Sequence, residues 1–300
     1  MSATTTTTTT TTITAPSTDS SYIPRGLTTA SITFYAPPPD NSAPFNYVEQ
    51  PPAGQPQRNY GEHEAEVSLT DIRATETNYT LDKDSFLALQ SVSTKTTYST
   101  FDSDSEVKEN YYPEVESLLR SAIPEIHKVI IFDHTIRRGY ADAPRQPVTR
   151  AHVDQTATAA AERVRLHVSD KEEAETLLKG RYRIVNVWKP LSSTDEPVQS
   201  SPLAFAAAGS VDASDLVAVQ HRYPHRVGET MGVQFNEGQK WHYWSGMKTD
   251  ERLLLKCSDS KGFKDGSVAQ WVPHTAFWDR RTPVGARPRE SIEVRALIFG

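Results

Sequence analysis

The chain has 300 residues, 32 basic and 38 acidic side chains, a net charge of -6 and a single cysteine, Cys257. Without a long basic run, this balance argues against nucleic acid or an anionic membrane as a partner, and one cysteine excludes an intramolecular disulfide. No apolar stretch approaches the roughly 20 residues that span a bilayer, and the start lacks the pattern of a signal peptide. We therefore expect a cytoplasmic protein with a substantial core.

The first part of the chain is predicted to be a tail followed by an extended arm. Residues 1–25 are rich in Thr and Ser and carry too little apolar surface to offset the entropy of ordering, so we expect them to be disordered. A short strand is expected over 31–35. The prolines spread over 37–56 then keep the chain irregular.

Helical patterns predominate between residues 84 and 180, with one strand among them. A short helix is expected over 84–89, and a clearer one over 113–122, where apolar residues recur on one stripe. The β-branched run 129–132 predicts a buried strand, and the Ala-rich segment 155–168 predicts a helix. A final helix is expected to begin at Ser169, with Glu172 completing a capping box, and to end at Gly180.

Strand patterns predominate from residue 181 onward. In the first of these segments Ile184, Asn186 and Trp188 alternate with Val185 and Val187, so the two sets lie on opposite faces. The expected strands cover 181–188, 241–245, 252–257, 267–272 and 291–299. Several short strands after a helical lead-in predict a β-barrel or a double-sheet jelly roll with flanking helices.

His152 and Asp154 form the first candidate site. Residues two apart in a strand point to the same face, so this imidazole and this carboxylate can reach one point. A second imidazole from elsewhere would complete the ligand set of non-haem Fe(II) oxygenases. The alternative is that His152 is an ordinary histidine and Asp154 caps the following helix. With nine histidines in the chain, the pattern leaves the third ligand open among His274, His221, His225 and His242.

Arg289 and Ser291 form the second candidate site, on one face of the last predicted strand. A guanidinium can bind a carboxylate through two hydrogen bonds, and a nearby hydroxyl can add a third. This pair therefore suits the distal carboxylate of 2-oxoglutarate, with Arg295 as the next candidate. The alternative is a weak surface ion pair of Arg289 with Glu290 or Glu293.

Eight segments together resemble a known family. They are 111–115 (YYPEV), 132–135 (FDHT), 151–156 (AHVDQT), 186–191 (NVWKPL), 202–204 (PLA), 241–259, 274–277 (HTAF) and 287–295 (RPRESIEVR). In this order, from about residue 32 to 299, they resemble the fungal gibberellin desaturase family, also described as aspergillic-acid-type hydroxylase/desaturases. Its members are Fe(II)/2-oxoglutarate-dependent oxygenases of secondary metabolism.

The resemblance implies a mixed α+β fold with a double-stranded β-helix, or jelly-roll, core and flanking helices. It implies a disordered tail over 1–25 and one oxygenase domain over 26–300, with an arm and helical lead-in over 26–150 and the metal-binding β-core over 151–300. It also implies Fe(II), 2-oxoglutarate and O2 as cofactors and cosubstrates. The substrate would be a small secondary metabolite, and the family allows a homo- or heterodimer.

The resemblance also assigns residues to roles. His152, Asp154 and His274 carry over as iron ligands, and Arg289 carries over as the 2-oxoglutarate anchor with Ser291 in support. Asn186, Trp188 and Lys189 are expected to line the pocket, although Lys189 stands where the family often has Arg. The implied function is hydroxylation or desaturation. The alternatives are a catalytically silent paralogue that stabilises an active partner, and a cupin-type barrel that binds a small ligand.

Overall fold

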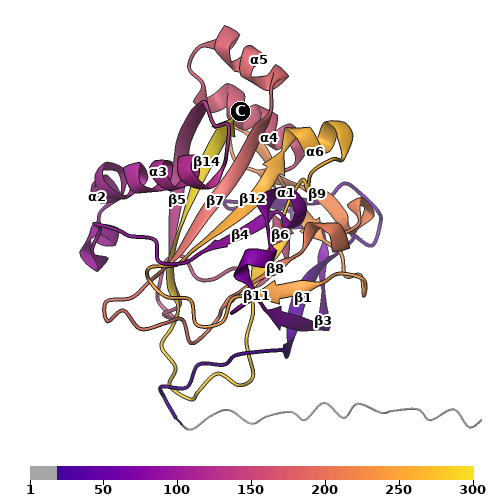
Figure 1. Cartoon of the computed structure of the whole chain (residues 1–300). Coiled ribbons are helices and arrows are strands. Elements are labelled where there is room, and N and C mark those ends of the chain that lie inside the picture. Colours follow the sequence, from indigo (N-terminus) through magenta and orange to yellow (C-terminus); the bar gives the residue numbers. More distant parts are fainter. Residues whose placement is uncertain (1–18) are drawn as a thin grey trace, which may run out of the picture.

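The protein's structure, a computed structural model, describes residues 19–300. Most of the predicted tail, residues 1–18, lies outside the described residues, so the expectation of disorder stays a prediction. Within 19–300 the strands form two sheets, and helices lie on one side and at one end of them (Figure 1). No helix in this described part is long and apolar enough to cross a membrane.

The larger sheet has nine strands and the smaller has five. In spatial order the larger sheet holds β1 (Thr28–Ala36), β3 (Gly61–Asp71), β11 (Trp241–Tyr243), β8 (Leu203–Ala206), β13 (His274–Ala276), β6 (His152–Val153), β10 (Val227–Val233), β9 (Leu216–Arg222) and β2 (Phe45–Tyr47). The smaller sheet holds β4 (Phe86–Leu89), β12 (Arg252–Asp259), β7 (Tyr182–Leu191), β14 (Glu290–Phe299) and β5 (Lys128–Arg138). Neighbouring strands pair in antiparallel orientation, except that β11 is parallel to β3 and β2 is parallel to β9.

The inner face of the five-stranded sheet packs against the nine-stranded sheet. Ile184 and Trp188 of β7 lie in one buried cluster with Leu203 and Phe205 of β8. Burying one such side chain contributes about 1.5–3 kcal/mol, so this shared cluster holds the two sheets together. The predicted alternation of β7 is thereby confirmed on this face.

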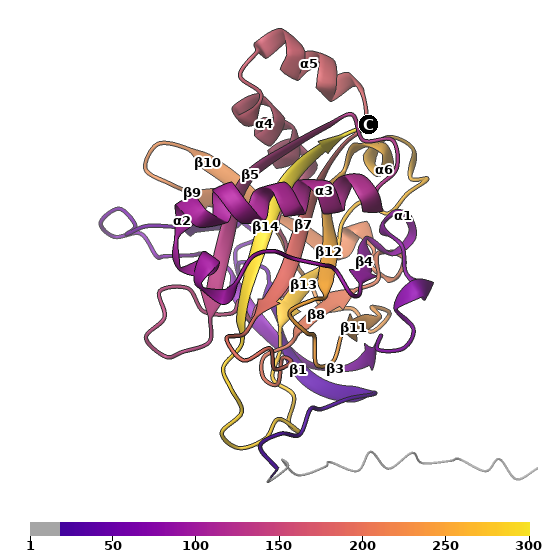
Figure 2. The same cartoon turned by 60° about the vertical axis from the view of Figure 1, so that its left-hand side comes forward.

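The outer face of the same sheet is covered by a helix. Val185 and Val187 of β7 join Val115 and Leu119 in a second buried cluster. The latter two belong to α3 (Tyr112–Ala122), which crosses in front of β14 and β7 (Figure 2). The predicted helix over 113–122 is confirmed, with a proline in its first turn.

The other α-helices have at most 11 residues. They are α1 (Leu81–Asp84), α2 (Asp104–Glu106), α4 (Ala157–His167), α5 (Lys171–Lys179) and α6 (Ser260–Asp265). The helix predicted over 155–168 is confirmed as α4, and the next is confirmed as α5, ending at Gly180. Its predicted cap is wrong by one residue, because Asp170 rather than Ser169 accepts the backbone N–H groups of Glu172 and Glu173.

Two predicted elements are wrong. The helix expected over 84–89 is the strand β4, because Ser85 adopts a left-handed conformation (φ 65°) that ends α1. The following residues then pair with β12 and bury Phe86. The strand expected over 267–272 is a loop, and the strand begins at His274, where β8 and β6 offer hydrogen-bonding partners on both sides.

Strands from the first half of the chain enter both sheets. β1, β2 and β3 join the larger sheet, and β4 and β5 join the smaller one. The sequence predicted parts of β1 and β5 but neither β2 nor β3. β3 carries charged residues at its exposed positions and few apolar ones, so its period-two pattern is weak. The arm is therefore part of the sheets that position the site.

Candidate metal centre

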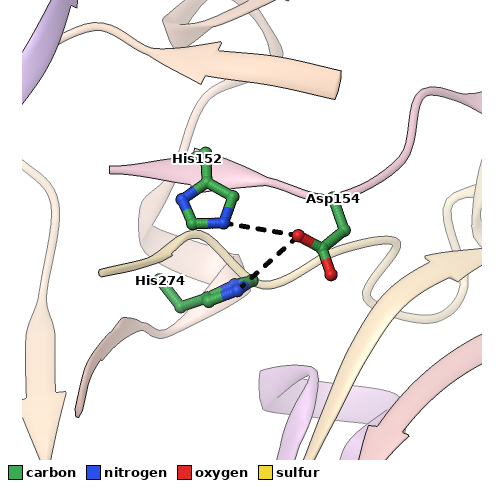
Figure 3. Close-up of side chains that lie close together, drawn as sticks. All are labelled: His152, Asp154 and His274. Atoms are coloured by element: carbon green, nitrogen blue, oxygen red, sulfur yellow. Dashed lines mark ion pairs between the residues drawn. The ribbon is translucent and has the colours of Figure 1, made fainter. Parts of the chain in front are cut away.

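Two very short strands bring His152 and His274 together. β6 and β13 lie side by side in the larger sheet, with His274 directly opposite His152 in an antiparallel pair. Asp154 follows β6 immediately and turns back toward both rings (Figure 3). One ligand atom from each of the three residues lies within 4.8 Å of the others.

The oxygen Oδ1 of Asp154 faces both imidazoles. It lies 3.3 Å from Nε2 of His152 and 3.9 Å from Nε2 of His274 (Figure 3). Three donors, two nitrogens and one oxygen, therefore face one point from one side. This is the donor set that suits Fe(II) and leaves coordination positions for other ligands.

Hydrogen bonds on the far side of each ring fix which nitrogen faces the centre. Nδ1 of His152 donates to the backbone carbonyl of Arg150 at 2.9 Å, and Nδ1 of His274 donates to that of Val272 at 3.1 Å. A carbonyl can only accept, so in the neutral ring the proton sits on Nδ1 and the lone pair on Nε2. Burial lowers the pKa of His274, and a proton on the neighbouring His152 would lower it further, so this neutral form is favoured.

The carboxylate of Asp154 stays ionised in this buried place. Burial alone would raise its pKa, but the imidazoles of His152 and His274, whenever either is protonated, and the charge of Arg295 hold the pKa well below its usual value. The alternative role of helix cap is wrong, because the side chain of Thr156 caps α4 by accepting the backbone N–H of Ala159.

Arg289 and Ser291 line the same cavity as the three candidate ligands. Arg289 is only 4 % exposed, and its Nη1 donates to the carbonyl of Ser201 at 2.7 Å. Its Nε has no hydrogen-bond partner among residues 19–300, and none of their carboxylates lies within ion-pair distance of it. Burial, together with the charge of Arg137, lowers the pKa of Arg289 to about 9.

The alternative of a surface ion pair for Arg289 is wrong, because its neighbours pair elsewhere. Glu290 accepts from Tyr98 and Tyr140 and pairs with Arg138. Glu293 pairs with Arg295. Arg289 is thus a buried cation without an anion, which is expensive unless a ligand supplies one.

The three predicted pocket residues of β7 lie in different surroundings. Trp188 lines the cavity, and its ring centroid is 5.4 Å from the guanidinium carbon of Arg289. Asn186 is fully buried and donates to Asp154 at 2.6 Å. Lys189 is not among the cavity residues, which corrects its prediction. The alternation of the strand turns it to the outer face, where its Nζ lies 5.2 Å from the Phe101 ring centroid.

Several cavity residues were not predicted as part of the site. Thr135 and Arg137 of β5 line it, as do Glu293 of β14 and Arg295, the last of which is the predicted second candidate anchor. The spacing in the last strand could have predicted two of them, because Glu293 and Arg295 lie at alternate positions that share one face with Arg289. Arg295, the second candidate anchor, is already engaged by Asp133 and Glu293.

Two packed sheets bring together two imidazoles and a carboxylate, and an unpaired buried guanidinium lies in the same cavity. These features are typical of a non-haem iron oxidoreductase. Comparison with known proteins narrows this class. The family model described as "Oxidoreductase/YMDC permease-like domain" matches residues 32–299. The chain is 34% identical to the hydroxylase/desaturase poxK of Penicillium oxalicum over 303 aligned positions, which cover 92% of each protein.

Two other similar proteins are named for their dependence on alpha-ketoglutarate. The alpha-ketoglutarate-dependent dioxygenase phiK of a fungal species is 30% identical, over 91% of this chain and 96% of phiK. The solved structure of the iron and alpha-ketoglutarate-dependent endoperoxidase NvfI superposes with a TM-score of 0.82 at 27% identity, over 92% of this chain and 99% of NvfI. The chain belongs to this oxidoreductase family, which includes fungal hydroxylase/desaturases. The resemblance predicted from the sequence is confirmed.

Proposed function

We propose that the chain is an Fe(II)/2-oxoglutarate-dependent oxygenase that hydroxylates or desaturates a small secondary metabolite of a fungal biosynthetic pathway. The observation that carries this proposal is the convergence of His152, Asp154 and His274, with the unpaired Arg289 in the same cavity. Relatives named hydroxylase/desaturase and alpha-ketoglutarate-dependent dioxygenase cover nearly the whole chain and support it.

Each residue of the site has a role in this proposal. His152, Asp154 and His274 hold the iron, which when bound supplies O2 activation coupled to conversion of 2-oxoglutarate into succinate and CO2. Arg289 binds the distal carboxylate of 2-oxoglutarate through its unpaired N–H groups, and Ser291 on the same face supports it. The ring of Trp188, whose centroid lies 5.4 Å from the guanidinium carbon, covers one flank of that side chain.

We also propose that the two sheets form a double-stranded β-helix core and that residues 26–300 are one oxygenase domain. Strands from both 26–150 and 151–300 share each sheet, which supports a single domain. A cytoplasmic location and a homo- or heterodimer remain predictions. The silent-paralogue and cupin-type alternatives are less well supported, because the three donors and the anion-binding arginine are all present.

The test is consumption of 2-oxoglutarate by purified protein. With Fe(II), O2 and metabolites of neighbouring biosynthetic genes, the wild type should form succinate and convert one metabolite by gain of an oxygen atom or loss of two hydrogens. His274→Ala should form neither. Arg287→Met, which removes a half-buried arginine paired with Glu196, serves as the control. Equal succinate formation by wild type and His274→Ala would refute the proposal.

A further inference from the structure

The two oxygens of the Asp154 carboxylate have different surroundings. Oδ1 faces the imidazoles of His152 and His274. Oδ2 faces away from them, with Nδ2 of Asn186 at 2.6 Å and Nε of Arg295 at 3.5 Å. One oxygen is therefore directed at the metal position, and the other is held by neighbouring side chains.

The groups that hold Oδ2 come from the opposite sheet. Asn186 and Arg295 lie directly opposite each other on β7 and β14 of the five-stranded sheet. Asp154 follows β6 of the nine-stranded sheet. The contact thus spans the interface between the sheets, and it fixes the carboxylate from outside the strand that carries it.

The amide of Asn186 has one orientation available. Facing a carboxylate, only the NH2 group can donate, so the amide oxygen must point the other way. That oxygen, Oδ1, is buried and has no hydrogen-bond partner in the described residues. Because Asn186 is fully buried, its contact with Asp154 is the one hydrogen bond that its side chain makes within residues 19–300.

Arg295 is itself held in place. Its Nη1 donates to Asp133 at 2.8 Å and its Nη2 to Glu293 at 2.5 Å, so its Nε is left facing Asp154. The guanidinium cannot turn toward the metal position without breaking both pairs. Asn186 supplies the short hydrogen bond, and Arg295 supplies fixed positive charge behind it.

We propose that Asn186, supported by Arg295, is a positioning residue that occupies Oδ2 so that Asp154 offers only Oδ1 to the metal. This inference rests on the proposed function, because it concerns the iron ligand. A carboxylate bound through one oxygen leaves more positions open beside two imidazoles than one bound through both. Without the amide, only the longer contact with Arg295 opposes rotation of the carboxylate, and its second oxygen would compete for a position that 2-oxoglutarate needs.

The test replaces the amide donor with an apolar side chain of similar size, Asn186→Leu. Co(II), which reports its coordination through its visible spectrum, is titrated into metal-free protein, and 2-oxoglutarate follows. Loss of a partner that orients a ligand typically weakens metal binding by about 10–100-fold. We expect a loss of this size, a changed Co(II) spectrum before 2-oxoglutarate is added, and weaker 2-oxoglutarate binding to the Co(II) form.

A matched control comes from the same strand. Lys189→Met alters a buried residue three positions along β7 that faces the outer side, and it should leave the Co(II) affinity and spectrum unchanged. Asn186→Ser, with a smaller polar side chain, is a second variant in case Asn186→Leu does not fold, and it should weaken Co(II) binding in the same direction.

The outcomes separate the two proposals. If wild type and control bind Co(II) and the Asn186 variants match them in affinity and spectrum, the positioning role is refuted while the metal site stands. If the wild type itself does not bind Co(II), the metal site fails and this inference falls with it. A loss of affinity with an unchanged spectrum would also overturn the positioning role, because the coordination would then not depend on the amide.

Discussion

Arg289→Met should make the ligand-free protein more stable and 2-oxoglutarate binding much weaker. Burial lowers the pKa of Arg289 to about 9. Compared with an ordinary guanidinium value of about 12.5, this corresponds to at most about 5 kcal/mol of unfavourable free energy in the charged form. Both folded and unfolded states are charged at neutral pH, so the penalty is constant there. It is relieved only as pH rises above about 9.

The net gain in stability is smaller than this penalty. The variant loses the hydrogen bond from Nη1 to the carbonyl of Ser201, which contributes about 1.5–3 kcal/mol for a charged donor. A gain of about 2 kcal/mol therefore remains, and each kcal/mol raises Tm by roughly 2–4 °C in a large domain. For the ligand, removing one partner of a buried ion pair costs about 3–5 kcal/mol. At about 1.4 kcal/mol per tenfold, 2-oxoglutarate should bind at least about 100-fold more weakly.

Thermal unfolding with Mn(II), with and without 2-oxoglutarate, measures both effects. A ligand that binds only the folded state raises Tm, so wild type should shift upward with 2-oxoglutarate and Arg289→Met should not. Arg289→Lys keeps a charge but not the two-pronged geometry, and it should fall between them. If Arg289→Met lowers Tm without ligand and keeps the shift caused by 2-oxoglutarate, the reasoning about an unpaired buried cation is refuted.

Three further predictions concern the metal, the buried lysine and one glycine. Chelating the metal should abolish the Tm shift caused by 2-oxoglutarate, and His274→Ala should do the same. Far-UV circular dichroism should stay unchanged, because hydrogen bonds to backbone carbonyls hold the rings of His152 and His274 without the metal. Loss of the fold would contradict this. Burial, with a lesser effect of Arg252, lowers the pKa of Lys189 to about 7. The unfolded chain therefore binds the extra proton between about pH 7 and 10.4, and stability should rise with pH by up to about 1.4 kcal/mol per pH unit in that window. Urea unfolding at several pH values should show this rise in wild type and a smaller slope in Lys189→Met, and equal slopes would exclude the effect. Gly232 lies on β10 opposite His152, and a Cβ added there would lie 2.8 Å from the Tyr35 ring. Gly232→Ala should therefore lower the free energy of unfolding in urea by about 1–3 kcal/mol. An unchanged stability would show that the Tyr35 ring moves aside.

The parts of the site that the sequence could predict follow from local geometry. His152 and Asp154 are two residues apart, and the structure directs both to one point. Arg289 and Ser291 behave in the same way and line one cavity. The alternation of β7 also placed Asn186 and Trp188 on one face. The same alternation puts Lys189 on the opposite face, so the segment 186–191 does not form one surface.

The parts that the sequence could not predict depend on pairing between distant segments. The choice of His274 among nine histidines came from resemblance, and the structure explains it by the pairing of β13 with β6. These strands have three and two residues, too few for a period-two pattern to be recognised. The strand β4 differs from the predicted helix, because nothing in its composition indicates that Ser85 adopts a left-handed conformation after which the chain pairs with β12.

The division of the site between the two sheets explains why the core matters to its chemistry. The proposed metal donors His152 and His274 lie in the nine-stranded sheet, and Asp154 directly follows its strand β6. Asn186 lies in the five-stranded sheet, and Arg289 directly precedes its strand β14. The distance between the proposed metal position and Arg289 is therefore set by the cluster that joins the sheets, in which Leu203 and Trp188 also line the cavity. Protein cores tolerate little change of volume without a shift of the backbone. A larger residue at position 203 should therefore weaken 2-oxoglutarate binding more than metal binding, because all three metal donors move with one sheet while the anchor moves with the other.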